Sequence, residues 1–150
     1  MKVCKFGGTS MANAECIKRV RDIIASDDQV TYVVVSAPGK REKGDTKVTD
    51  LLYACLDAVH DGKTANDAFA PVKERFDSII KGLDLTIDLA DRYSEIINKL
   101  DGGATKDYIA SRGEYLSAIV LSAALGWQFV DAADFVRFDE NGNFLASETN

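Results

Sequence analysis

The hydrophobic positions change their spacing near the start of the chain, and these changes predict a strand, a helix and a second strand. The residues just before Gly7 have the composition of a short strand, and Val30–Val35 is a β-branched run. Between them, Asn13 precedes an apolar stripe at helical spacing, made of Cys16, Ile17, Val20, Ile23 and Ile24. We therefore expect a right-handed β-α-β unit in a parallel sheet, with Val30–Val35 buried on both faces.

The rest of the chain is predicted to be mainly helical. Thr46 is expected to cap a helix whose apolar positions run from Val48 to Val59. Two amphipathic helices are expected between Asn66 and Leu100. A fourth helix, Tyr115–Leu125, is rich in alanine and serine, which allow close packing, and Trp127–Val130 predicts another short strand. Together these elements indicate an α/β fold.

Composition narrows the class of protein. The 150 residues have the length of one domain, with 46% apolar and 28% charged residues, and a net charge of −6 argues against a nucleic-acid partner. Cys4, Cys16 and Cys55 lie in apolar contexts without a C-x-x-C motif, which predicts buried thiols in a reducing compartment. The N-terminus has no basic-then-apolar leader, and no apolar run approaches ~20 residues. We expect a soluble, cytoplasmic protein without a membrane partner.

Two adjacent glycines follow the first predicted strand, in the string Lys5-Phe6-Gly7-Gly8-Thr9-Ser10. Glycines leave backbone N–H groups free to converge on an anion, and a nearby lysine adds positive charge for phosphoryl transfer. The lysine precedes the glycines, unlike in G-x-x-x-x-G-K-[ST], and G-x-G-x-x-G is absent from the sequence. The local pattern alone leaves two interpretations open, a phosphate-binding loop or a tight connection between strand and helix.

The loop after the second strand, Ser36–Gly39, should lie at the same sheet edge as the glycines, because the carboxyl ends of parallel strands meet there. Residues Lys40–Asp45 contain no apolar side chain and are either a mobile loop over this crevice or a solvated connection. Thr49 falls in the first turn of the next helix, near the crevice. His60, the only histidine, is expected at the surface.

Ser111 and Glu114 have two competing interpretations. They fit the capping box S-x-x-E, in which the glutamate accepts a backbone N–H at the start of a helix. In the alternative, the Glu114 carboxylate faces a substrate. The spacing alone does not separate these roles.

Four segments in this order resemble the N-terminal lobe of aspartokinases, within the amino acid kinase family. They are Lys5–Ser10, Ser36 in the loop after the second strand, Val48–Leu52 (Val-Thr-Asp-Leu-Leu), and Ser111–Ala118 (Ser-Arg-Gly-Glu-Tyr-Leu-Ser-Ala). The resemblance covers essentially the whole chain. It implies a three-layer α/β/α sandwich with a mainly parallel sheet, in which residues 1–150 form the N-terminal, substrate-binding lobe.

The same resemblance implies the reaction and the roles of single residues. ATP, with Mg²⁺, would phosphorylate the side-chain carboxylate of L-aspartate to 4-phospho-L-aspartate, the first step towards lysine, threonine and methionine. Ser36 would bind both phosphate and substrate, since it would lie between phosphate donor and acceptor, while Thr49 and Glu114 would hold the aspartate. The phosphate-binding residues would be Lys5, which is also catalytic, and Gly7, Gly8, Thr9 and Ser10. No metal ligand is identified in the sequence.

Other functions stay open. A glutamate 5-kinase or an acetylglutamate kinase would share the fold, although Thr9-Ser10, Thr49 and Glu114 favour aspartate. A non-catalytic amino-acid-binding module is a further alternative. The sequence contains no Gly-Arg-Gly-Gly-Ser-Asp-like segment, so we expect the nucleotide-binding half and the regulatory domains to be absent and the chain alone to be inactive. The full-length enzyme is expected to be a homodimer.

Overall fold

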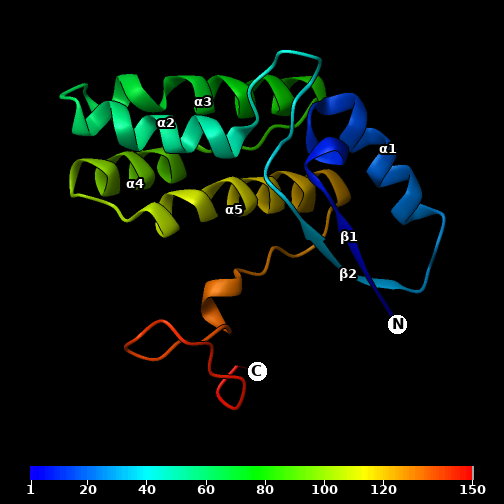
Figure 1. Cartoon of the computed structure of the whole chain (residues 1–150). Helices are drawn as coiled ribbons and strands as arrows, with labels where there is room; N and C mark the ends of the chain where they lie inside the picture. Colours follow the sequence, from blue (N-terminus) through cyan, green and yellow to red (C-terminus); the bar gives the residue numbers. More distant parts are fainter. Residues whose placement is uncertain (150) are drawn as a thin grey trace.

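The computed structural model describes residues 1–149 and shows an α/β fold in which five α-helices accompany a parallel sheet (Figure 1). In chain order the elements are β1 (Lys2–Phe6), the 3₁₀ helix η1 (Gly8–Met11), α1 (Ala14–Ala25), β2 (Val30–Val35), α2 (Val48–His60), α3 (Ala65–Gly82), α4 (Ala90–Asp101), α5 (Lys106–Leu125) and the 3₁₀ helix η2 (Ala132–Asp134). The predicted fold class is confirmed.

The predicted β-α-β unit is present. Strands β1 and β2 pair in parallel, with Lys5 opposite Val34 and Phe6 opposite Val35. The Asn13 side chain caps α1 by accepting a hydrogen bond from the Cys16 backbone N–H at 2.9 Å. Both strands therefore end at the same sheet edge, where the glycine turn and the Ser36 loop begin.

The prediction that β2 is buried on both faces is wrong for the described residues. Val35 is buried, but Val3, Tyr32 and Val34 on the opposite face are 66%, 57% and 52% exposed. The described sheet has two strands, and only one of its faces packs against the core. The β-branched composition of β2 therefore reflects strand propensity more than burial.

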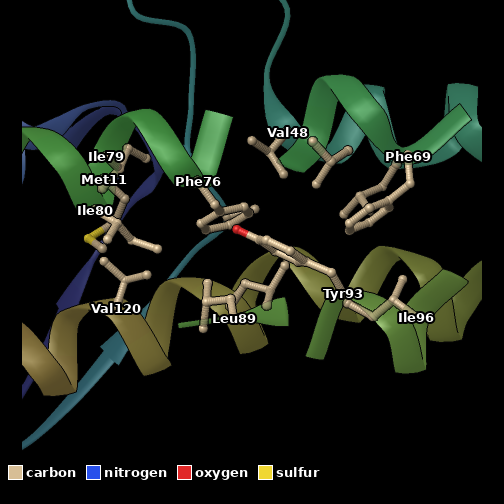
Figure 2. Packing of buried hydrophobic residues seen from close by; sticks show 14 of the residues in the cluster. Met11, Val48, Phe69, Phe76, Ile79, Ile80, Leu89, Tyr93, Ile96 and Val120 are labelled. Atoms are coloured by element: carbon tan, nitrogen blue, oxygen red, sulfur yellow. The ribbon is translucent and has the colours of Figure 1, made fainter. Parts of the chain in front are cut away.

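A core of apolar side chains joins α2, α3, α4 and α5 (Figure 2). Phe69 and Phe76 are fully buried, and the Phe69 and Tyr93 rings pack at an inclined angle, 5.7 Å between centroids. The Tyr93 hydroxyl donates to Asp77 Oδ1 at 3.0 Å, and burial raises the pKa of this phenol. Burying one large apolar side chain contributes about 1.5–3 kcal/mol to the free energy of unfolding. The helices therefore form a stable platform for the loops at the sheet edge.

Two helix starts differ from the predictions. Helix α2 begins at Val48, and its cap residue is Lys47, not the predicted Thr46. The Thr46 carbonyl accepts a hydrogen bond from Arg75 at 2.9 Å and not the first hydrogen bond of the helix. Helix α5 begins at Lys106, well before the predicted Tyr115, and Thr105 caps it by accepting the Tyr108 N–H at 3.2 Å. The two helices predicted between Asn66 and Leu100 are confirmed as α3 and α4.

The strand predicted at Trp127–Val130 is not formed. This segment leaves α5 in an extended path towards the C-terminal tail (Figure 1). It lines a pocket of about 120 Å³ together with Thr31–Val33 and Val35 of β2, and within the described residues no backbone hydrogen bond joins the two segments. Without such bonds an apolar segment does not form the hydrogen-bonded ladder that defines a strand.

The three cysteines are free thiols, and they differ in burial. Cys55 is buried as predicted, and burial raises its pKa to about 11. Cys4 and Cys16 are only half-buried, so the prediction of full burial is wrong for them. Among the described residues, no helix has both the length and the apolar composition to span a bilayer.

Candidate active site

The glycine turn after β1 has an open outer side. The Gly7 carbonyl accepts hydrogen bonds from the Ser10 and Met11 N–H groups at 3.0 and 3.2 Å. A Cβ atom on Gly7 would meet no heavy atom within 4 Å. The Lys5 side chain, at the end of β1, is exposed. This arrangement has room for an anion beside backbone and lysine donors, as the phosphate-binding interpretation requires.

The glycine turn and the loop after β2 touch through their backbones, as predicted. The Gly39 N–H donates to the Gly8 carbonyl at 2.8 Å, and the Ser36 N–H donates to the Phe6 carbonyl at 3.0 Å. A Cβ atom on Gly39 would lie 2.7 Å from the Gly8 carbonyl carbon, and one on Gly8 would lie 3.0 Å from the Ala37 oxygen. Both positions need glycine because backbone atoms, which cannot move aside, occupy the space.

Helix α5 comes close to the same loop at Gly113. A Cβ atom there would lie 2.6 Å from the Ala37 Cβ and 3.5 Å from Val48 Cγ1. Ser36, Thr49 and Glu114 are the sequence neighbours of Ala37, Val48 and Gly113. One close contact thus brings together the three elements that carry the predicted substrate residues.

Thr49 and Glu114 line one cavity of about 860 Å³, between α2, α5 and the segment after α5. Its wall also includes Val33–Val35 of β2, Tyr53, Ala110–Arg112, Tyr115, Ala118, Phe129–Ala133, Val136 and Phe138. Among the described residues, its lining includes neither Lys5, nor the glycine turn with Thr9 and Ser10, nor Ser36. The structure therefore brings Thr49 and Glu114 together in one cavity, and the described lining of that cavity does not include the predicted phosphate residues.

The capping-box interpretation of Ser111 and Glu114 is wrong. Both residues lie inside α5, and the Ser111 hydroxyl donates to the Tyr108 carbonyl at 2.7 Å, as serines inside helices often do. Glu114 is exposed and has no hydrogen bond or ion pair to any residue within 1–149. Its carboxylate is available to a ligand in the cavity.

Arg112 also lines this cavity, a place for it that the sequence did not predict. Its guanidinium lies 4.6 Å from the Tyr108 ring centroid and 4.5 Å from that of Tyr115, and it donates to Ser111 Oγ at 2.9 and 3.1 Å. An arginine between tyrosines at i−4 and i+3 on one helix is a signal that could have revealed this stacking. The cavity wall consequently carries fixed charge of both signs.

Residues Lys40–Asp45 follow Gly39, which is bonded to the glycine turn, and none of them lines the cavity. The Asp45 carboxylate accepts hydrogen bonds from the Arg41 and Arg75 guanidinium groups, whereas Lys40–Lys43 are exposed. Of the two interpretations of this loop, the structure fits a solvated connection, which is held at its end by Asp45. His60 is exposed at the end of α2, as predicted.

Comparison with known proteins places this geometry in a family. The model of the amino acid kinase family matches residues 1–148. The chain belongs to the amino acid kinase family. Aspartokinase 3 of Bacillus subtilis is 33% identical over 99% of this chain. The crystal structure of Clostridium acetobutylicum aspartate kinase is 39% identical over 98% of the chain, with a TM-score of 0.91. The resemblance to aspartokinases is confirmed.

For a more distant relative, the similarity to this chain shows only that the fold is shared. Escherichia coli aspartokinase III, solved in complex with aspartate and ADP, is 24% identical over 83% of this chain, with a TM-score of 0.63. The chain spans about a third of the length of its Bacillus and Clostridium relatives, 34% in each case.

Proposed function

We propose that this chain is the N-terminal, substrate-binding lobe of an aspartate kinase, which transfers phosphate from ATP to the side-chain carboxylate of L-aspartate. The observation that carries the proposal is the shared cavity of Thr49 and Glu114, next to a glycine turn that is open on its outer side. The relatives with 33% and 39% identity are an aspartokinase and an aspartate kinase.

The aspartate is held by groups of opposite polarity. Glu114, which has no partner among the described residues, pairs with the α-ammonium in a charge-assisted hydrogen bond. Thr49 lies in the first turn of α2, where the hydroxyl and the positive helix end favour a substrate carboxylate. An amine that carries an acetyl group cannot make the first contact, which argues against the acetylglutamate kinase alternative.

The phosphates of ATP lie at the glycine turn. Gly7 and Gly8, with Thr9 and Ser10, offer backbone and hydroxyl donors, and Lys5 brings positive charge. Ser36, hydrogen-bonded to the end of β1, stands between the two substrates. The acceptor is a carboxylate, a nucleophile that needs no general base, so positioning and charge neutralisation suffice.

ATP enters such reactions with Mg²⁺, which neutralises phosphate charge when bound. Within residues 1–149 there is no group of three His, Cys, Asp or Glu side chains that could hold a metal, so this lobe offers no ready ligand set. The homodimer, the cytoplasmic location and the place in lysine, threonine and methionine biosynthesis stay predictions from the sequence.

A chimera tests the proposal. This chain replaces the matching residues of the Clostridium enzyme, and ADP formation is measured with L-aspartate, L-glutamate or N-acetyl-L-glutamate as the acceptor. We expect ADP formation that depends on aspartate. Preference for either glutamate compound, in a chimera that still binds ATP, would contradict the proposal.

A further inference from the structure

Arg75 of α3 is the one charged residue among those described whose side chain is buried, with only 4% exposed. Arginine is rarely buried unless its charge is paired and its N–H donors are satisfied. Arg75 lines none of the described cavities, so it has no direct access to a ligand there. The hydrogen-bond partners of Arg75 must therefore explain why its charge is buried.

The Arg75 guanidinium joins the two ends of the loop between β2 and α2. At the start of the loop, Nη1 donates to the Gly39 carbonyl at 3.0 Å. At its end, Nη2 donates to Asp45 Oδ2 at 2.9 Å and to the Thr46 carbonyl at 2.9 Å. The planar guanidinium can serve several acceptors at once, which a lysine ammonium at the end of its chain cannot do with the same geometry.

Each end of this loop leads directly to a proposed substrate position. Gly39 donates its N–H to Gly8 in the glycine turn. Thr46 is followed by Lys47, the cap residue of α2, and Thr49 lies in the first turn of that helix. The Val48 N–H also donates to the Pro38 carbonyl at 2.9 Å, which closes the loop at its neck.

We propose that Arg75 is a positioning residue that fixes the separation of the glycine turn and Thr49 by clamping the loop at Gly39 and Thr46. The inference rests on the proposed function for the substrates it assigns to those two places. In-line phosphoryl transfer requires donor and acceptor to be held within a fraction of an ångström, so a clamp between their sites serves catalysis without touching either substrate.

The test uses Arg75→Met and Arg75→Lys in this chain. Methionine matches the stem of arginine without its charge, and Asp45 keeps Arg41 as a partner, at 2.8 Å, so no unpaired charge is left buried. Arg75→Lys keeps the charge, and it takes the place of Arg75→Met in the test if the methionine variant does not fold. Lys81→Met, an exposed position on the same helix, is the matched control.

Two quantities are measured: amide hydrogen exchange at Gly39 and Val48 without ligand, and the Kd for L-aspartate. We expect both exchange rates to rise at least about tenfold in Arg75→Met, and the Kd to rise by a similar factor, equivalent to about 1.4 kcal/mol. Arg75→Lys should show the same direction, and Lys81→Met no change.

Unchanged exchange at both amides in a folded Arg75 variant would overturn the proposal, even if the melting temperature fell. So would faster exchange with an unchanged Kd, because the loop would then be held for stability alone. If the unaltered chain binds no aspartate, the proposed function fails separately, and exchange at Gly39 and Val48 still decides whether Arg75 clamps the loop.

Discussion

Glu114 and Arg112 place opposite charges on one stretch of α5, and both line the cavity that also contains Thr49. Their settings differ. Arg112 is held between two tyrosine rings and by Ser111, whereas Glu114 has no partner within the described part of the chain. A carboxylate left without a partner is suited to bind a substrate ammonium.

Glu114→Gln should weaken aspartate binding at least about tenfold, or about 1.4 kcal/mol, because the amide keeps the shape but loses the charge. The melting temperature should stay within a few degrees, since the carboxylate makes no contact that the fold needs. Calorimetry and thermal unfolding measure the two effects. Glu74→Gln, at an exposed position on α3, is the control. A lowered melting temperature with unchanged affinity would return Glu114 to a structural role.

Lys5→Met should lower ADP formation by the chimera about a hundredfold or more, corresponding to ~3 kcal/mol, and leave the aspartate Kd nearly unaltered. The reason is that, in the proposed function, the Lys5 charge faces the phosphates and acts most strongly in the transition state. Steady-state kinetics and calorimetry separate the two quantities. Lys2→Met, at the other end of β1, is the control. Normal turnover with a raised aspartate requirement would refute the assignment of Lys5.

Helix α5 shows where local sequence signals were insufficient. The apolar spacing in α1 to α4 predicted those helices well, because one face of each packs on the core. In α5, Ser111 and Glu114 matched the capping-box pattern of a helix start, although both lie inside the helix. Position 113 needs a glycine because the helix lies close to Ala37, which is far from it in the sequence. A sequence pattern cannot show such a contact.

Part of the candidate site was predictable from the sequence, because the strand topology determines which loops meet. Parallel strands require the glycine turn and the Ser36 loop to share an edge, and the contact of Gly8 with Gly39 confirms it. The wall formed by Phe129–Ala133 was not predictable, because the segment is irregular as far as the start of η2 at Ala132. Packing places it, as in the edge contact of Phe129 with Tyr115. Arg75 was not predicted because its partners, the Gly39 and Thr46 carbonyls and the Asp45 carboxylate, lie far from it in the sequence.

Gly113→Ala should destabilise the chain. Overpacking costs about 1–3 kcal/mol, whereas replacing glycine by alanine inside a helix gains only about 1 kcal/mol, so a net loss is expected. The added methyl would lie 2.6 Å from the Ala37 Cβ. Urea unfolding measures the difference. Gly7→Ala, where the added methyl meets no atom, should change the free energy of unfolding by less than about 0.5 kcal/mol. Equal effects of the two substitutions would contradict this view of the α5 contact.

Asp45 should make the stability of the loop sensitive to acid. Hydrogen bonds from the Arg41 side chain and backbone hold the pKa of the Asp45 carboxyl well below its usual value of 3.8. A lowered pKa in the folded state means that the charged form stabilises the protein above the usual value, and that this stability is lost as the pH falls below it. In Asp45→Asn, the free energy of unfolding should therefore fall less steeply below about pH 4.

Urea unfolding at a series of pH values measures this dependence. Asp57→Asn, an exposed carboxyl on α2, should retain the full acid dependence of the unaltered chain. If Asp45→Asn and the unaltered chain lose stability in parallel below pH 4, Asp45 is not the group responsible.

In the whole molecule, the two residues proposed to hold aspartate, Thr49 and Glu114, belong to the helical body. The four helices α2–α5 form a packed body, and the site residues lie where this body meets the end of the sheet (Figures 1 and 2). The exposed face of the sheet includes Val3, Tyr32 and Val34, and of these Val34 lines the cavity together with Thr49 and Glu114. Aspartate binding is therefore expected to depend on the cavity between α2 and α5.

Calorimetric titration of the chain with L-aspartate and with L-glutamate tests this claim most directly. We predict saturable binding of aspartate at one site per chain, with glutamate weaker by roughly tenfold or more, since one extra methylene changes binding by about 1–3 kcal/mol. Absence of aspartate binding at millimolar concentrations, or equal affinity for the two amino acids, would contradict the account.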